Sequence, residues 1–305
     1  MSLKGAWAEK PYYTQFLVLI AVVFLFTGVG LIAWMLSLNN VFGLDIFNNP
    51  ALLSDMSNKS VVNALQVWQT LQGFIVFIIP AYCTAYLISR KPLNYVHLIK
   101  PNYKVLLLAG TIMLLSSPLI DCMGYVNAKM SLPSFLKGLE DWMREKELQA
   151  ADITKVFLNI SSVGDLCFKI LMIALLPALG EELIFRGVIQ SIFNKGFNNR
   201  HIAIIITALL FSAMHMQFFG FLPRFIMGIY LGYLLELSGS IWVPVFAHFI
   251  NNALAVCMAY YYPTMLDKEG SPEAPNVLLT IVSAMAVVIV YRQMQKINTQ
   301  QANGL

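Results

Sequence analysis

Eight continuous apolar runs are the feature that most limits what this chain can fold into. A helix needs about 20 apolar residues to cross a bilayer, whereas a membrane-spanning strand shows alternating apolar and polar residues. The runs are continuous, so the chain is predicted to be an all-α, polytopic membrane protein with about eight transmembrane helices. The expected spans lie near residues 14–37, 65–89, 104–125, 166–193, 201–217, 221–238, 241–262 and 275–291.

The composition and the first apolar run support this interpretation. Hydrophobic residues make up 58% of the chain and charged residues 12%, whereas a soluble domain carries about 25% charged residues. The run that follows Lys4 and Lys10 is too long for the core of a signal peptide, so we expect a retained anchor. The sequence contains no basic patch that suggests a nucleic-acid partner, and membrane lipid is the expected surrounding.

Basic residues concentrate in alternate loops. Because Lys and Arg are enriched on the cytoplasmic side of membrane proteins, both termini are predicted to be cytoplasmic. The third loop, residues 126–165, would then lie outside, and its basic residues are balanced by acidic ones. The basic residues on the side of the termini are Lys4, Lys10, Arg90, Lys91, Lys100, Lys104, Lys195, Arg200, Arg292 and Lys296.

Residues 1–305 are expected to form one transmembrane domain with a single long extramembrane loop. Within that loop, residues 126–165, the stretch PSFLKGLEDWMREKELQA opens with Pro133 and carries apolar residues on one helical face. This pattern predicts an amphipathic helix on the membrane surface. The helix either gates access to the interior of the bundle or simply connects two spans.

Three charges interrupt the fourth apolar run, in the stretch ALGEELIFRG at residues 178–187. A charged residue at the centre of a membrane helix costs about 2.5–3.5 kcal/mol. Glu182 and Arg186 are four residues apart, so they can form a salt bridge on one helix face. Glu181 is rotated from Glu182 by about 100° and lies away from this pair. We therefore interpret the pair as structural and leave Glu181 as the carboxylate that packing does not explain.

Two later spans carry polar residues that could meet Glu181. Span five ends with Phe211 and His215 one turn apart, and span seven places His248 and Asn252 on one face. Counted at 1.5 Å per residue from the expected cytoplasmic ends, the four polar groups lie roughly 12–21 Å deep. Their similar depth permits these groups to meet, and the region 165–260 carries all of them.

This set of side chains suits amide hydrolysis. A glutamate and a histidine can take a proton from water, and a second pair of donors can hold the negative charge that develops on a carbonyl oxygen. A metal is the alternative, because two histidines and a carboxylate leave a fourth zinc position open for water. If a metal is present, its expected ligands are Glu181, His215 and His248. Neither HExxH nor GxSxG occurs in the chain, so two common hydrolase signatures are missing.

Three motifs in order carry a resemblance to a known family. EELIFR at Glu181–Arg186, FSAMH at Phe211–His215 and HFINN at 248–252 match the patterns EExxxR, FxxxH and HxxxN. The sequence resembles the CAAX prenyl endopeptidase and bacteriocin-processing (CPBP, Abi) family of intramembrane proteases over about residues 165–260. The resemblance implies an eight-helix fold around a membrane-embedded cavity.

The resemblance also implies roles for individual residues. Glu181 and His215 would activate the attacking water, while His248 and Asn252 would stabilise the oxyanion. Members of the family have been described both as metalloproteases and as glutamate-based enzymes without an obligatory metal, and the version without a required cofactor is expected here. The residues expected to support the site are Glu182, Arg186 and Phe211.

The resulting expectation is an intramembrane endopeptidase that acts on a peptide or a membrane-associated protein. Eukaryotic members of the family cleave prenylated CAAX termini, and bacterial members are linked to bacteriocin maturation or self-immunity. The short polar loops resemble the prokaryotic members, so a prokaryotic cell membrane is the expected location. The alternatives are a zinc-dependent version of the same protease, a non-proteolytic immunity or scaffold protein, and an ion-coupled transporter. The transporter is disfavoured because no repeated pair of broken helices is evident.

Overall fold

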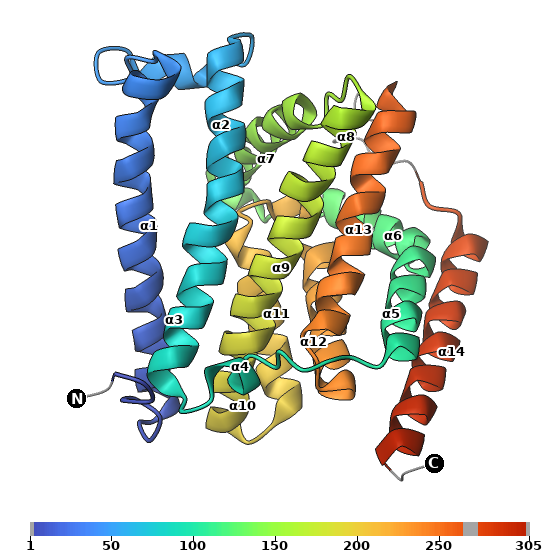
Figure 1. Cartoon of the computed structure of the whole chain (residues 1–305). Helices are drawn as coiled ribbons and strands as arrows, with labels where there is room; N and C mark the ends of the chain where they lie inside the picture. The colour runs from blue at the N-terminus through green and yellow to red at the C-terminus, as the bar shows by residue number, and fades with distance from the viewer. Residues whose placement is uncertain (1–2, 265–273, 303–305) are drawn as a thin grey trace.

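The computed structural model describes residues 3–264 and 274–302, and every regular element within these ranges is helical. Figure 1 shows the long helices side by side in a bundle, with their connections at its two ends. The elements are α1 Tyr12–Phe42, η1 Pro50–Ser54, α2 Lys59–Gln72, η2 Gly73–Ile78, α3 Ile79–Ile88, α4 Pro92–Tyr95, α5 Tyr103–Leu115, α6 Ser117–Ala128, η3 Ser134–Leu136, α7 Lys137–Phe157, α8 Val163–Lys169, η4 Ile170–Leu175, α9 Leu176–Glu182, η5 Leu183–Gln190, α10 Ser191–Phe197, α11 Arg200–Met214, η6 Phe218–Gly220, α12 Phe221–Ser238, α13 Trp242–Tyr261 and α14 Val277–Ala302.

The described helices confirm an α-helical membrane protein. Six of them are long and apolar enough to cross a membrane, and the pair α5 and α6, bent by 45°, makes a seventh if it counts as one span. The expected number of eight is therefore approximate. The six are Tyr12–Phe42, Lys59–Ile88, Val163–Phe197, Phe218–Ser238, Trp242–Tyr261 and Val277–Thr299.

Helix α11 explains the difference in number. The sequence suggested a span near 201–217, but the helix comprises 15 residues and ends at Met214. At 1.5 Å per residue it is only about 22 Å long, which is short of a hydrocarbon core of about 30 Å. The chain leaves the helical conformation at Met216, where φ is 53°. Helix α11 therefore ends inside the bundle and presents residues at its carboxyl end to the interior.

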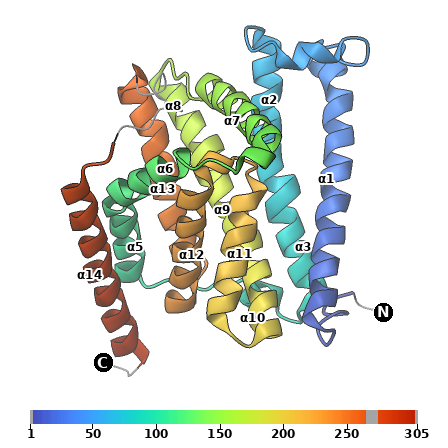
Figure 2. The same cartoon turned by 180° about the vertical axis from the view of Figure 1, so that it is seen from behind.

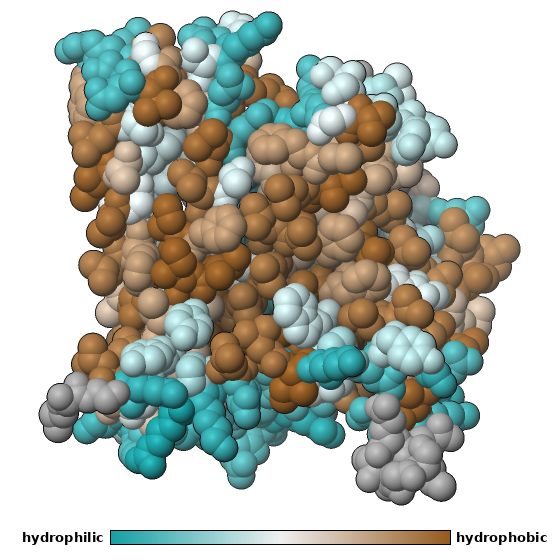
Figure 3. Space-filling view, viewed as in Figure 1, coloured by the Kyte–Doolittle hydropathy of each residue, from teal (hydrophilic) through white to brown (hydrophobic). Residues whose placement is uncertain are grey.

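The surface has the layering that a bilayer requires. Figure 3 shows an apolar band across the visible face, with hydrophilic residues gathered at both ends. Both termini lie at the same end of the bundle as α4 and α10 (Figure 1). The two ends of the chain therefore share one side of the membrane.

The span Val163–Phe197 lies at the centre of the bundle. Its segments contact η2 and α3 on one side and α11, α12 and α13 on the other (Figures 1 and 2). The second of its two π-helical segments, η5, is buried along its whole length of eight residues. A π-helical segment is rare and often marks a functional position. Glu181, Glu182 and Arg186, which lie in or just before η5, are consequently surrounded by other helices and do not face lipid.

Helix α7 occupies the predicted extramembrane loop and lies at the end opposite the termini (Figure 2). Its Trp142 ring packs against Phe218 with 5.7 Å between the ring centroids. The guanidinium of Arg144 lies 4.4 Å from the centroid of Phe219. Helix α7 is thus attached to the connection η6, which follows α11 and leads into α12.

Candidate active site

A buried ion pair stands at the junction of α9 and η5. The Nη1 group of Arg186 donates to Oε1 of Glu182 at 2.8 Å, and neither side chain is exposed to solvent. The predicted pairing of these two residues is therefore confirmed. Residue 182 also lies close to the middle of the 35-residue span Val163–Phe197, so the pair is buried at the depth where an unpaired charge costs most.

Gly228 on α12 is a second hydrogen-bond partner of Arg186. The Nη2 group donates to the carbonyl oxygen of Gly228 at 3.1 Å. A Cβ atom at Gly228 would lie 3.0 Å from Cβ of Ala208, so a larger residue would push α12 away from α11. Sequence reasoning missed this contact, although Gly228 and Gly232 form the small-xxx-small spacing that lets membrane helices approach closely.

His248 joins the two adjacent carboxylates. Its Nδ1 lies 2.8 Å from Oε1 of Glu182, and its Nε2 lies 3.9 Å from Oε2 of Glu181. Because a carboxylate accepts hydrogen bonds, Nδ1 is the nitrogen that carries the proton in this contact. The histidine is thereby fixed in orientation by a residue 66 positions earlier in the chain, with Nε2 directed toward Glu181.

Phe211 and His215 form the third side of the site. His215 caps the carboxyl end of α11, and its Nδ1 lies 2.9 Å from the carbonyl oxygen of Phe211. The fully buried Phe211 ring makes T-shaped contacts with both imidazoles, at 5.1 Å from His215 and 5.8 Å from His248. His215 also interacts electrostatically with Glu181. Phe211 therefore holds the two histidine rings on the same aromatic neighbour.

Asn252 lies one helical turn beyond His248 on α13. Its Oδ1 accepts a hydrogen bond from Nδ2 of Asn251 at 3.2 Å. Within the part of the chain that the structure describes, it makes no hydrogen bond to Glu181, His215 or His248. The structure thus gathers six of the seven expected site residues, and the role of Asn252 as an oxyanion donor stays a prediction.

Arg224 is a charged residue of the site that sequence reasoning did not single out. It lies in the first turn of α12 and donates to the main-chain oxygen of Gln217 at 3.0 Å and to its side-chain oxygen at 2.6 Å. It interacts electrostatically with Glu181 and with Glu147 of α7. An arginine within the apolar run 221–238 was the available signal, because a charge in such a run is by default a candidate for function.

Two polar residues hold the connection between α11 and α12. The hydroxyl of Ser212 donates to the carbonyl oxygen of Phe221 at 2.7 Å. The side chain of Asn127 accepts from the backbone N–H of Leu222 at 2.6 Å and donates to the carbonyl oxygen of Phe218 at 3.0 Å. These bonds fix the loop that carries Gln217, and through it the position of Arg224.

Glu181, His215 and His248 are the side chains expected to bind a metal, if one is present. Among residues 3–264 and 274–302, no group of three or more His, Cys, Asp or Glu side chains is arranged to hold a metal ion. His215 and His248 each direct one ring nitrogen to a protein oxygen. A histidine that binds zinc commonly engages its other ring nitrogen in this way, so these contacts do not decide between the two versions, and the zinc-dependent version stays a prediction.

Comparison with known proteins points to one family. Residues 164–254 match the sequence model of the type II CAAX prenyl endopeptidase Rce1-like family. The chain is 33% identical over 104 residues to the uncharacterized protein YpbD of Bacillus subtilis (strain 168), which is 33% of this chain and 50% of YpbD. It is 31% identical over 108 residues to an uncharacterized 24.3 kDa protein of Escherichia coli, which is 34% of this chain and 49% of that protein.

A third relative is the sporulation-killing factor biosynthesis protein SkfC of Bacillus subtilis (strain 168). The identity is 39% over 88 residues, which is 27% of this chain and 17% of SkfC. The chain thus spans about half the length of the first two relatives and less of the third. No solved structure matches the chain. The family match covers all seven residues of the expected site, and residues 164–254 of this chain are similar to the type II CAAX prenyl endopeptidase Rce1-like family.

Proposed function

We propose that this chain is an intramembrane endopeptidase in which Glu181 and His215 activate water, with no required cofactor. The observation that carries the proposal is the convergence of Glu181, His215 and His248 from three separate segments of the bundle. Ionisable residues at this depth are costly, and their gathering at one point is typical of a functional site.

The geometry supports different roles for Glu181 and His215 in the first step. The carboxylate of Glu181 takes a proton from water while the water oxygen forms a bond to the carbonyl carbon of the substrate. His215, whose Nδ1 is engaged by the carbonyl of Phe211, has Nε2 left to orient that water. The carbon–nitrogen bond then breaks, and the proton passes to the amide nitrogen of the leaving segment.

His248 and Asn252 are the proposed donors to the oxyanion. Nδ1 of His248 is committed to Glu182, so Nε2 donates only when both ring nitrogens carry a proton. The carboxylates of Glu181 and Glu182 both face this ring. Asn252 would contribute its amide group after turning from Asn251, and preorganised donors of this kind are a major source of catalysis.

The position of the site favours a substrate that enters the bilayer. The site lies mid-way along a membrane span, so the scissile bond must belong to a peptide or to a membrane-associated protein segment. We place the protein in a prokaryotic cell membrane with cytoplasmic termini. CAAX-type termini, from the description of the matching family, are the substrate class to test first, followed by precursors of secreted factors such as the sporulation-killing factor that SkfC is named for.

His215→Ala is expected to lower kcat by about 10²–10⁴-fold, because a group that takes part in proton transfer contributes that much. The matched control is His201→Ala, since His201 is exposed at the other end of α11 and bonds to the hydroxyl of Tyr233 at 2.6 Å. The measurement is peptide cleavage by protein reconstituted into liposomes. Equal rates for the two variants would rule out the role given to His215.

The same assay separates the alternative functions. Metal analysis of the purified protein and cleavage after treatment with a chelator test the zinc-dependent version. Activity that is lost with zinc and restored by zinc alone would favour that version over the one proposed. A non-proteolytic immunity or scaffold protein would release no new amino terminus from any peptide tested.

Arg224→Gln is expected to raise KM for a peptide with a free terminal carboxylate by about tenfold or more, with kcat changed less. A hydrogen bond to a charged group contributes about 1.5–3 kcal/mol. Gln217 occupies two of the five N–H groups of Arg224, so the rest can reach a substrate. Arg224→Lys should restore part of the affinity, and an amidated peptide should be insensitive. Equal effects on free and amidated peptides would contradict this role.

A further inference from the structure

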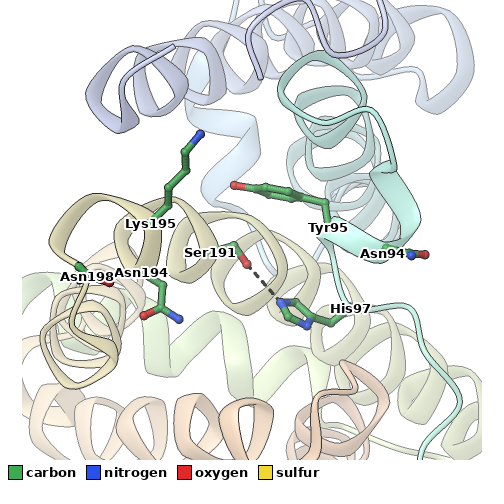
Figure 4. A pocket seen from close by; sticks show the side chains of 7 residues that line it. All are labelled: Asn94, Tyr95, His97, Ser191, Asn194, Lys195 and Asn198. Atoms are coloured by element: carbon green, nitrogen blue, oxygen red, sulfur yellow. Dashed lines mark hydrogen bonds between the residues drawn. The ribbon is translucent and has the colours of Figure 1, made fainter. Parts of the chain in front are cut away.

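A second polar site lies at the end of the bundle where the chain begins and ends. It is a pocket of about 530 Å³ between the segment that follows α3 and helix α10. Ser191 follows Glu182 by nine residues, so the pocket lies roughly 14 Å along the span from the buried ion pair. Figure 4 shows the side chains that line it, which are Asn94, Tyr95, His97, Ser191, Asn194, Lys195 and Asn198.

The wall formed by the chain after α4 is held in a fixed conformation. His97 has a φ of 57°, which is uncommon for a residue other than glycine. Its carbonyl oxygen accepts from the backbone N–H of Ile241 at 2.9 Å, and the hydroxyl of Ser240 donates to the carbonyl oxygen of Ile99. The turn between α12 and α13 therefore anchors this wall, and strained backbone that is held in this way is often found at ligand sites.

Two hydrogen-bond donors on the lining, Lys195 and Tyr95, come from different elements. Lys195 is exposed, and its Nζ donates to the carbonyl oxygen of Ala8 at 2.9 Å, which uses one of its three N–H groups. The hydroxyl oxygen of Tyr95 is buried and has no hydrogen-bond partner among the described residues. In Figure 4 this hydroxyl points toward the space between Lys195 and Ser191. A buried polar group without a partner is unfavourable, so an acceptor brought by a ligand would relieve it.

His97 contributes to the pocket as a neutral ring. Burial lowers its pKa, although the hydrogen bond to the carbonyl of Gly239 and the charge of Glu236 act in the opposite direction. Its Nε2 lies 3.5 Å from the hydroxyl of Ser191. Glu236 does not line the pocket, and its charge is taken up by amide groups of Gln190 and Asn194 at 3.2 and 3.1 Å.

The electrostatic setting of this end is positive. Ten Lys and Arg residues occur in the segments at this end, against two acidic residues, Glu9 and Glu236. A basic pocket between helix ends at the surface of a membrane is suited to lipid headgroups. We propose that the pocket binds a phosphate group, with Lys195 as its charged contact and the headgroup of a membrane phospholipid as its main source.

Access to the Tyr95 hydroxyl needs a small movement. The oxygen is buried, so a phosphate oxygen reaches it when the groups that cover it shift, and the exposed Lys195 side chain is free to turn from Ala8 into the pocket. Such a turn brings the ammonium group to the phosphate as well. Lys195 and Tyr95 then act on the same ligand from two different elements.

The test measures phospholipid retained by the full-length protein in detergent, by native mass spectrometry, with phosphatidylglycerol and with diacylglycerol, which lacks phosphate. Lys195→Gln should reduce retention of phosphatidylglycerol by about tenfold or more, because a charged contact is lost. Tyr95→Phe should reduce it by about two- to tenfold, as for one neutral hydrogen bond. Lys100→Gln is the matched control, since Lys100 is an exposed lysine at the same end outside the pocket.

The outcomes distinguish a lipid headgroup from inorganic phosphate as the ligand, and a stability measurement shows whether a variant is misfolded. Inorganic phosphate bound as tightly as the lipid would support the site with a soluble source, whereas weaker binding supports the headgroup. The thermal stability of Tyr95→Phe in lipid-free detergent should be unchanged or raised, because its hydroxyl has no partner to lose. Equal retention by all three variants, or retention of diacylglycerol like that of phosphatidylglycerol, would overturn the proposal.

Discussion

Glu181→Gln is expected to abolish peptide cleavage while folded protein is retained. The substitution keeps the shape of the side chain and removes the carboxylate that takes the proton from water. General bases contribute about 10²–10⁴-fold to the rate, and kcat should fall by at least that factor. The measurement is the rate at which reconstituted protein releases a new amino terminus from a peptide, for the parent and the variant in parallel.

The stability of the Glu181→Gln protein distinguishes a catalytic from a structural role. Glu181 is buried, and its nearest ring nitrogen, on His248, is 3.9 Å away. It thus lacks the close ion pair that Glu182 has, and a buried charge without one is costly. We expect the melting temperature to be unchanged or raised. Glu236→Gln is the control, because it removes a carboxylate on α12 outside the site. Full cleavage by Glu181→Gln would end the proposed mechanism.

Arg186→Met is expected to reduce the free energy of unfolding by about 3–5 kcal/mol. Removing one partner of a buried pair leaves the other charge uncompensated, and both Arg186 and Glu182 are fully buried. The variant would also lose the bond to the carbonyl of Gly228 and the contact of 4.5 Å with the Phe211 ring. Denaturant titration of the purified protein measures the loss.

An exposed pair with the same spacing provides the control. Lys137 and Asp141 on α7 are also four residues apart, with 3.5 Å between the ammonium and carboxylate groups, and their side chains are 77% and 60% exposed. Exposed pairs contribute at most about 1 kcal/mol, so Lys137→Met should have a small effect. The double variant Glu182→Met/Arg186→Met should regain much of the stability, because no unpaired charge remains. A loss for Arg186→Met as small as that of Lys137→Met would contradict the structural role of the buried pair.

Local patterns in the sequence were sufficient for the fold class and for part of the site. Continuous apolar runs predict membrane helices because the backbone must satisfy its own hydrogen bonds in lipid. The spacing of four residues between Glu182 and Arg186 predicts their ion pair because such residues share one helix face, and the structure has that pair. The gathering of Glu181, His215 and His248 was expected only from rough depths and from the resemblance to a family. The bent pair α5 and α6 and the early end of α11 were not expected.

Only the tertiary structure decided which helices supply the partners of each buried group. His248 reaches Glu182 across 66 positions, and Gly228 reaches Arg186 across 42. Asn252, by contrast, bonds to its neighbour on α13, although its helix face is the one that carries His248. The period of a helix fixes which residues share a face, but it does not fix how that helix is rotated, tilted or ended against its neighbours. Those quantities follow from packing between segments distant in the chain, so the sequence by itself determined the helices and their polar faces, and the bundle determined the site.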